Sequence, residues 1–124
     1  MTDLLDDPTQ LESLLEACKP YKVEPWMSIE SEEYFRNLLR TYTETDSSYP
    51  VSQWLQEQIA ARFRTVGKYP EWIQSPQWEF LEGEPMIFMG QINLNDPPTD
   101  LFHDGATFYV FYLNGRTKVV LQKY

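Results

Sequence analysis

The chain has 124 residues, of which 42% are apolar and 15% aromatic, and its nineteen acids and ten bases give a net charge of −9. This length fits one small domain, and the aromatic content is high enough to bury a core, which excludes a disordered chain. No apolar run approaches the roughly 18 residues of a membrane-spanning helix. The acidic residues 1–7 also differ from a secretion signal. We therefore expect a cytoplasmic protein that does not bind a membrane.

The charge is unevenly distributed. Residues 1–62 contain twelve acids and five bases (−7), whereas residues 63–124 contain seven acids and five bases (−2). The bases are scattered, which excludes nucleic acid as a direct ligand because phosphate binding needs clustered Lys and Arg. The acidic half favours either solubility alone or a basic protein partner. The single cysteine, Cys18, cannot form an internal disulfide or a zinc site, so we expect no metal and no cofactor.

Helical spacing dominates residues 1–65. Thr9 and Glu12 form a capping-box pattern for a first helix, which Pro20 ends. Residues 20–27 contain two prolines and are expected to form an extended connector.

Two further helices follow this connector. Ser28 or Ser31 caps the second helix. The third begins near Pro50, and Gly67 is its expected C-terminal cap residue. The apolar stripes of the three helices are Leu11, Leu14, Leu15 and Cys18; Tyr34, Phe35, Leu38, Leu39 and Tyr42; and Val51, Trp54, Leu55, Ile59 and Phe63.

In the sheet part, residues 66–124, apolar residues recur at every second position, which is the spacing of a β-strand. Residues 83–85 predict a turn, and Asn114-Gly115 suits a two-residue type I′ hairpin turn. Residues 86–92 are nearly all apolar, which is typical of a central strand. The four predicted strands are residues 77–82, 86–92, 106–113 and 116–123.

Helices that are segregated from an antiparallel sheet indicate an α+β fold. We expect three N-terminal helices followed by an antiparallel sheet of about four strands in two hairpins. Neither a linker nor a repeat separates the halves, so the chain is predicted to form a single domain over residues 1–124. Its helical part covers residues 1–65 and its sheet part residues 66–124.

Several short motifs of the sheet part occur in a familiar order. They are Val-Gly-Lys-Tyr-Pro-Glu-Trp-Ile-Gln at residues 66–74, Gly-Glu-Pro-Met-Ile-Phe-Met-Gly-Gln-Ile at residues 83–92, and Asp-Gly at residues 104–105 before an aromatic strand. This part resembles the YwqG-like family of bacterial proteins of unknown function and, more distantly, segments of the programmed-cell-death-2-like proteins. The resemblance implies antiparallel sheets with short helices. Members often carry a cysteine pair where this chain has residues 80–84, so no metal site is implied here.

His103 and Asp104 are the one pair suited to acid–base work, with Asp100 nearby. A general base needs an oriented substrate and usually a third group. The pair can equally form a loop-closing hydrogen bond before Gly105. A catalytic and a structural role therefore both stay open.

Gln74 and Gln91 lie in apolar surroundings, where an amide without partners costs about 1–3 kcal/mol. Each can pair with nearby backbone. Alternatively, the two amides line a peptide-binding groove together with Trp72 and Trp78, since Trp is enriched at interfaces.

These observations favour a non-catalytic protein-interaction module that can self-associate. Two alternatives stay open: an acidic immunity or inhibitor protein that covers a basic partner surface, and a small enzyme that uses His103 and Asp104. We expect a partner with a basic surface, because acids on the helices predict a continuous negative surface. Those acids are Asp3, Asp6, Asp7, Glu12, Glu16, Glu30, Glu32 and Glu33.

Overall fold

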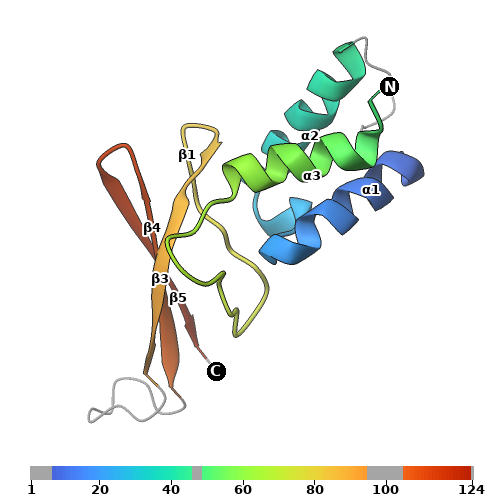
Figure 1. Ribbon diagram of the computed structural model, residues 1–124. Coiled ribbons are helices and arrows are strands. Elements are labelled where there is room, and N and C mark those ends of the chain that lie inside the picture. Colours follow the sequence, from blue (N-terminus) through green and yellow to red (C-terminus); the bar gives the residue numbers. More distant parts are fainter. Residues whose placement is uncertain (1–6, 46–48, 95–104, 124) are drawn as a thin grey trace.

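The computed structural model describes residues 7–45, 49–94 and 105–123. Helices precede strands along the chain (Figure 1), which confirms the predicted α+β class. The helices are α1 (Pro8–Cys18), α2 (Ile29–Glu44) and α3 (Val51–Arg62), with short 3₁₀ helices η2 (Lys19–Tyr21) and η3 (Pro25–Met27) between α1 and α2. The strands are β1 (Phe80–Leu81), β2 (Glu84–Pro85), β3 (Ile87–Leu94), β4 (Ala106–Leu113) and β5 (Arg116–Lys123).

The N-terminus of α1 differs from the predicted capping box. The carboxylate of Asp7 accepts hydrogen bonds from the backbone N–H groups of Thr9 (3.0 Å) and Gln10 (3.2 Å). Pro8 occupies the first helical position, where the N–H that it lacks is not needed. The helix therefore begins earlier, and the cap assigned to Thr9 and Glu12 was wrong because Asp7 already satisfies the free amides.

The connector to α2 is also more ordered than expected, since its two prolines lie in η2 and η3 rather than in extended chain. Ser28 caps α2 by accepting a hydrogen bond from the Ser31 N–H (3.0 Å). The buried Ser31 hydroxyl donates to the Glu24 carbonyl (3.0 Å), which fixes the connector against the helix. Of the two predicted caps, Ser28 is therefore the correct one.

The third helix ends before the predicted glycine. Phe63 follows the last residue of α3, leaves the helical conformation and is fully buried. Gly67 lies beyond the end of the helix, so its assignment as the cap was wrong. Burial of the Phe63 ring in the core turns the chain there instead.

The strands form two antiparallel sheets, β1–β2 and β3-β4-β5, instead of one sheet of about four strands. β4 is the central strand of the larger sheet, so the expectation that residues 86–92 are central was wrong: β3 lies at its edge. Asn114 and Gly115 have φ values of +50° and +80°, which confirms the predicted turn between β4 and β5. The predicted strand at residues 77–82 shortens to β1, and Trp78, which precedes it, is buried in the core with its indole N–H on the Met86 carbonyl.

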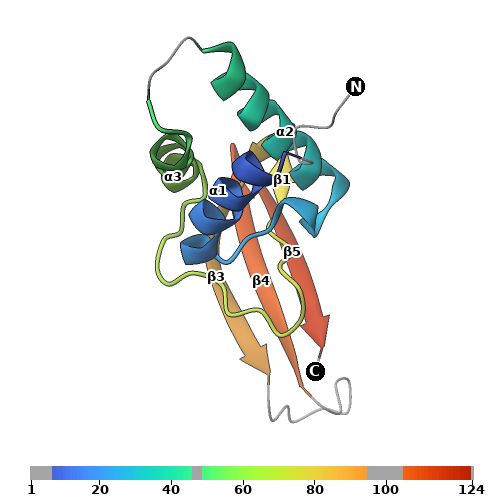
Figure 2. The same cartoon turned by 90° about the vertical axis from the view of Figure 1, so that its right-hand side faces the viewer.

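The helices cover only one face of the sheet β3-β4-β5. Figures 1 and 2 agree that α1 and the segment between α3 and β1 lie on the same side of it. One apolar cluster joins the two parts of the chain. From the helical part it includes Leu14, Phe35, Leu39, Leu55, Ile59 and Phe63, and from the sheet part Trp78, Phe80, Met86, Phe88, Tyr109 and Phe111. Among the described residues, no helix has the length and apolar character needed to cross a membrane.

Candidate functional site

The two glutamines singled out by the sequence make their hydrogen bonds at opposite edges of the larger sheet. Gln91, on β3, accepts a hydrogen bond from the Glu71 N–H (2.8 Å) and donates to the Asn93 side chain (3.0 Å). The Gln74 side chain donates to the carbonyl of Lys123 on β5 (2.9 Å). Since β4 separates β3 from β5, the two amides do not share a groove. Each anchors the segment before β1 to one edge of the sheet.

Trp72 and Trp78, which were expected to line a peptide-binding groove with these glutamines, differ in exposure. Trp78 is 2% exposed, and its indole N–H donates to the Met86 carbonyl (2.8 Å). Trp72 is half-buried over Tyr109, with ring centroids 4.6 Å apart, and its indole N–H donates to the Lys22 carbonyl (2.9 Å). Of the pair, only Trp72 therefore offers surface to a ligand. His103 and Asp104 lie outside the described residues.

Gln122 is the polar side chain that organises this region, and sequence reasoning missed it. It is 1% exposed on β5. Its carbonyl oxygen accepts from the N–H groups of Ile73 (3.0 Å) and Gln74 (2.9 Å). Its amide group donates to the Ser75 carbonyl and to the Gln77 side chain, both at 2.8 Å. The sequence does contain a signal for this residue: side chains alternate along a strand, so Gln122 lies on the same face of β5 as Val120, which is buried.

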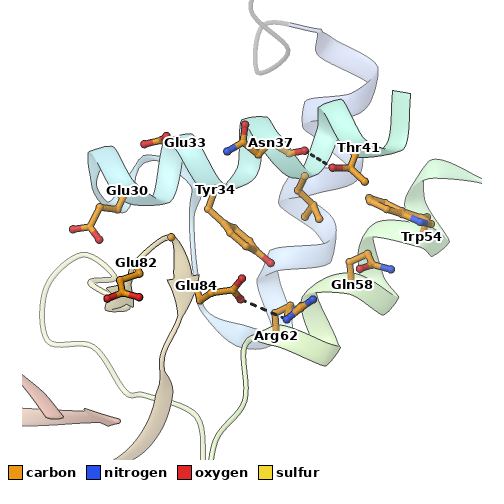
Figure 3. A pocket seen from close by; sticks show the side chains of 12 residues that line it. Glu30, Glu33, Tyr34, Asn37, Thr41, Trp54, Gln58, Arg62, Glu82 and Glu84 are labelled. Atoms are coloured by element: carbon orange, nitrogen blue, oxygen red, sulfur yellow. Dashed lines mark hydrogen bonds and ion pairs between the residues drawn. The ribbon is translucent and has the colours of Figure 1, made fainter. Parts of the chain in front are cut away.

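A separate cleft opens between α2, α3 and the β1–β2 turn, and Figure 3 shows its lining. Its volume is about 560 Å³. The residues that line it are Glu30, Glu33, Tyr34, Asn37, Leu38 and Thr41 of α2; Trp54, Gln58 and Arg62 of α3; and Glu82, Gly83 and Glu84 at the turn. We call this space the acidic cleft.

Four carboxylates and one guanidinium line the acidic cleft. Glu30 and Glu33 extend from α2, while Glu82 and Glu84 come from the facing turn (Figure 3). Arg62 forms an ion pair with Glu84, with 3.5 Å between Nη1 and Oε2. Within the described part of the chain, no group of three or more acidic, His or Cys side chains is close enough to hold a metal ion. The carboxylates are therefore spread around the opening instead of converging on one point.

Aromatic side chains form part of the wall of the acidic cleft. The Tyr34 ring packs against Phe35, Phe63 and Phe80 of the core, with centroids 5.2 to 5.8 Å apart. Its hydroxyl points from α2 toward Arg62 and Glu84 (Figure 3). Burial raises the pKa of Tyr34 to about 12, so the hydroxyl stays protonated at neutral pH and can donate a hydrogen bond.

Cys18, the single cysteine of the chain, does not form part of a catalytic or binding site. Its side chain is 1% exposed within the core. Burial raises the pKa of the thiol to about 12, with a further contribution from Glu24. Because the thiolate is the reactive form, this cysteine is a structural residue.

No protein-family model, curated protein or solved structure matches the chain. The geometry of the acidic cleft and of the sheet is therefore the basis for any function inferred.

Proposed function

We propose that the protein is a non-catalytic interaction module whose acidic cleft binds a basic segment of a partner protein. The observation that carries this proposal is the charge of the lining: four carboxylates come from two separate elements, and Arg62 is already paired with Glu84. Two of the four, Glu30 of α2 and Glu82 of the turn, lie on facing sides of the opening (Figure 3). An incoming Lys or Arg would complement this charge.

The spacing of the carboxylates favours an extended peptide segment, rather than a single metal ion, as the ligand of the acidic cleft. They do not converge closely enough to chelate a metal, and all four are exposed. Small-molecule sites are usually enclosed and mostly apolar, whereas this lining is dominated by polar side chains. Several Lys or Arg side chains on one partner segment would use all the carboxylates at once.

The walls of the acidic cleft are held in place by the core, so binding would require little reorganisation. Ser28 caps α2 at the end that carries Glu30 and Glu33. On the opposite wall, Glu82 and Gly83 form a tight turn with φ values of +51° and +80°. A preformed site loses less conformational entropy on binding than a mobile loop does.

An immunity or inhibitor role is a special case of the same proposal, in which the basic segment belongs to a toxin or an enzyme. The acidic cleft supports both versions equally, and identification of the partner distinguishes them. The resemblance of residues 66–124 to the YwqG-like family stays a prediction and does not bear on this surface.

The test is a titration of the full chain with an arginine-rich model peptide, followed by amide NMR. We expect chemical-shift changes to be concentrated at Gly83, Gln58 and the Trp54 indole N–H. A peptide with Glu in place of each Arg should cause none. Shifts spread evenly over every acidic part of the surface would contradict the proposal.

Matched variants separate the acidic cleft from general charge. Glu33→Gln combined with Glu82→Gln should weaken peptide binding about 3- to 10-fold at low salt, since exposed ion pairs contribute about 0.2–1 kcal/mol each. The control combines Glu12→Gln with Glu44→Gln, which are exposed residues outside the cleft lining. The control removes the same charge, so an equal loss of affinity in both variants would show that the cleft is not the site.

A further inference from the structure

The face of the sheet β3-β4-β5 that points away from the helices carries an apolar patch. Register places Ile92, Phe108 and Leu121 in one row across the three strands, and Val110 and Val119 in the next row. Among these, Ile92 is 57%, Val119 56% and Leu121 41% exposed. We call this surface the outer face. Contiguous exposed apolar residues on a folded protein mark an interaction surface.

The next row extends the outer face toward the β4–β5 turn. Tyr112 on β4 is 40% exposed and lies between Ile87 of β3 and Thr117 of β5. In Figure 1, no described helix lies on this side of the sheet. Together with the rows of Val110 and Ile92, Tyr112 makes the patch continuous along the strands.

We propose that the outer face binds the same face of a second copy, giving a two-fold symmetric dimer. The charge distribution favours this occupant. The sequences of β3, β4 and β5 contain no acidic residue. Of the three bases of β5, the register places Lys123 on this face, at its end in the row of Leu94 and Ala106. A basic segment would therefore gain nothing on the outer face, whereas a second copy supplies an apolar face of the same shape and twist.

The net charge of −9 does not prevent this arrangement. When two sheets pack face to face, the helices of each copy lie on the far sides of the assembly. The acids of the two copies are then separated by more than the roughly 10 Å between packed sheets. That distance exceeds the screening length of about 8 Å at physiological ionic strength, so repulsion between them is weak.

The size of the outer face predicts a reversible dimer. Three strands of eight residues span about 26 Å along the strands and about 14 Å across them. Such a footprint corresponds to an interface on the order of 1,000 Å² in total, at the lower end of specific complexes. We therefore expect a dissociation constant in the micromolar range.

Sedimentation equilibrium of the full chain alone, between about 1 and 500 µM, tests this range. We expect a monomer–dimer equilibrium. A protein that stays monomeric over the whole range, or that forms larger open assemblies, would overturn the proposal. Because no basic peptide is added, this outcome does not depend on the peptide binding proposed for the acidic cleft.

Variants locate the contact. Val119→Lys should raise the dimer dissociation constant at least about 10-fold, because it places an unpaired charge inside an apolar interface. Ile29→Lys makes the same change of charge at a site on α2 that is 84% exposed, and should leave the constant unchanged. Val119→Thr keeps the β-branched shape and the fold, and should weaken the dimer by a smaller factor. Equal weakening by Val119→Lys and Ile29→Lys, or none by either Val119 variant, would overturn the proposal.

Discussion

The buried amide of Gln122 holds the irregular segment before β1 against the sheet. It uses both of its amide hydrogens and both lone pairs of its oxygen, on four groups between Ile73 and Gln77. Segments without regular structure leave many backbone groups without partners, and buried groups of this kind must be satisfied. The Gln122 side chain therefore supplies hydrogen bonds to backbone groups that a neighbouring strand would otherwise supply.

Gln122→Ala should lower the free energy of unfolding by about 2–4 kcal/mol, because several buried polar groups lose their partners together. The matched control is Gln74→Ala, which removes one exposed hydrogen bond to the Lys123 carbonyl and should cost less than about 1 kcal/mol. Urea denaturation of the two variants checks the difference. Equal losses would mean that the network around Gln122 contributes no more than one exposed bond.

At the level of elements, Phe63 joins the helices to the sheet. Its ring stacks on Phe35 of α2, with centroids 5.7 Å apart and an angle of 2° between the planes. It also meets Trp78 (5.3 Å) and Phe80 (6.1 Å) edge-on. Through this ring, aromatic residues of the helical part and of the sheet part are buried against each other.

Phe63→Ala should destabilise the protein by about 3–5 kcal/mol through the cavity that it leaves. Because the ring contacts both parts, unfolding followed by helix content and by tryptophan fluorescence should shift together and remain a single transition. Two separate transitions in the variant or in the wild type would show that the helices and the sheet unfold independently.

At the scale of the whole molecule, the described residues place the acidic cleft and the outer face on different sides of the larger sheet. The acidic cleft is formed by α2, α3 and the β1–β2 turn, whereas the outer face belongs to strands without acidic residues. Of the acids expected to form a negative surface, Asp3 and Asp6 lie outside the described residues. In a two-fold dimer the acidic clefts would lie away from the interface, so each copy could still bind a basic segment.

Salt should separate the two binding modes. Raising the ionic strength screens exposed charges, so a basic peptide should associate severalfold more slowly and bind the acidic cleft more weakly. The dimer depends on apolar burial and should not weaken under the same change. Stopped-flow association of the peptide and sedimentation of the protein, each at low and high salt, check this contrast. Peptide association that is independent of salt would point to apolar contacts instead.

The sequence by itself determined the elements whose signals are local. The aromatic and β-branched residues of 106–113, together with the Asn114-Gly115 turn, predicted β4, β5 and their hairpin, because strand propensity and backbone φ preference are expressed locally in the chain. Helical periodicity located α1, α2 and α3 for the same reason. Their ends were predicted less well, since Asp7 and Phe63 act through a cap and a core contact that compete with other local patterns.

Only the tertiary structure decided how these elements meet. Which strand is central depends on pairing between distant segments, so the apolar composition of β3 did not reveal its place at the edge. The acidic cleft combines Glu33 with Glu82, and the network of Gln122 reaches Ile73, over separations of 49 residues in each case. No local pattern encodes such contacts. They arise because the buried aromatic cluster brings the helices and the sheet together, and charge and hydrogen bonding then act between residues that are far apart in the chain.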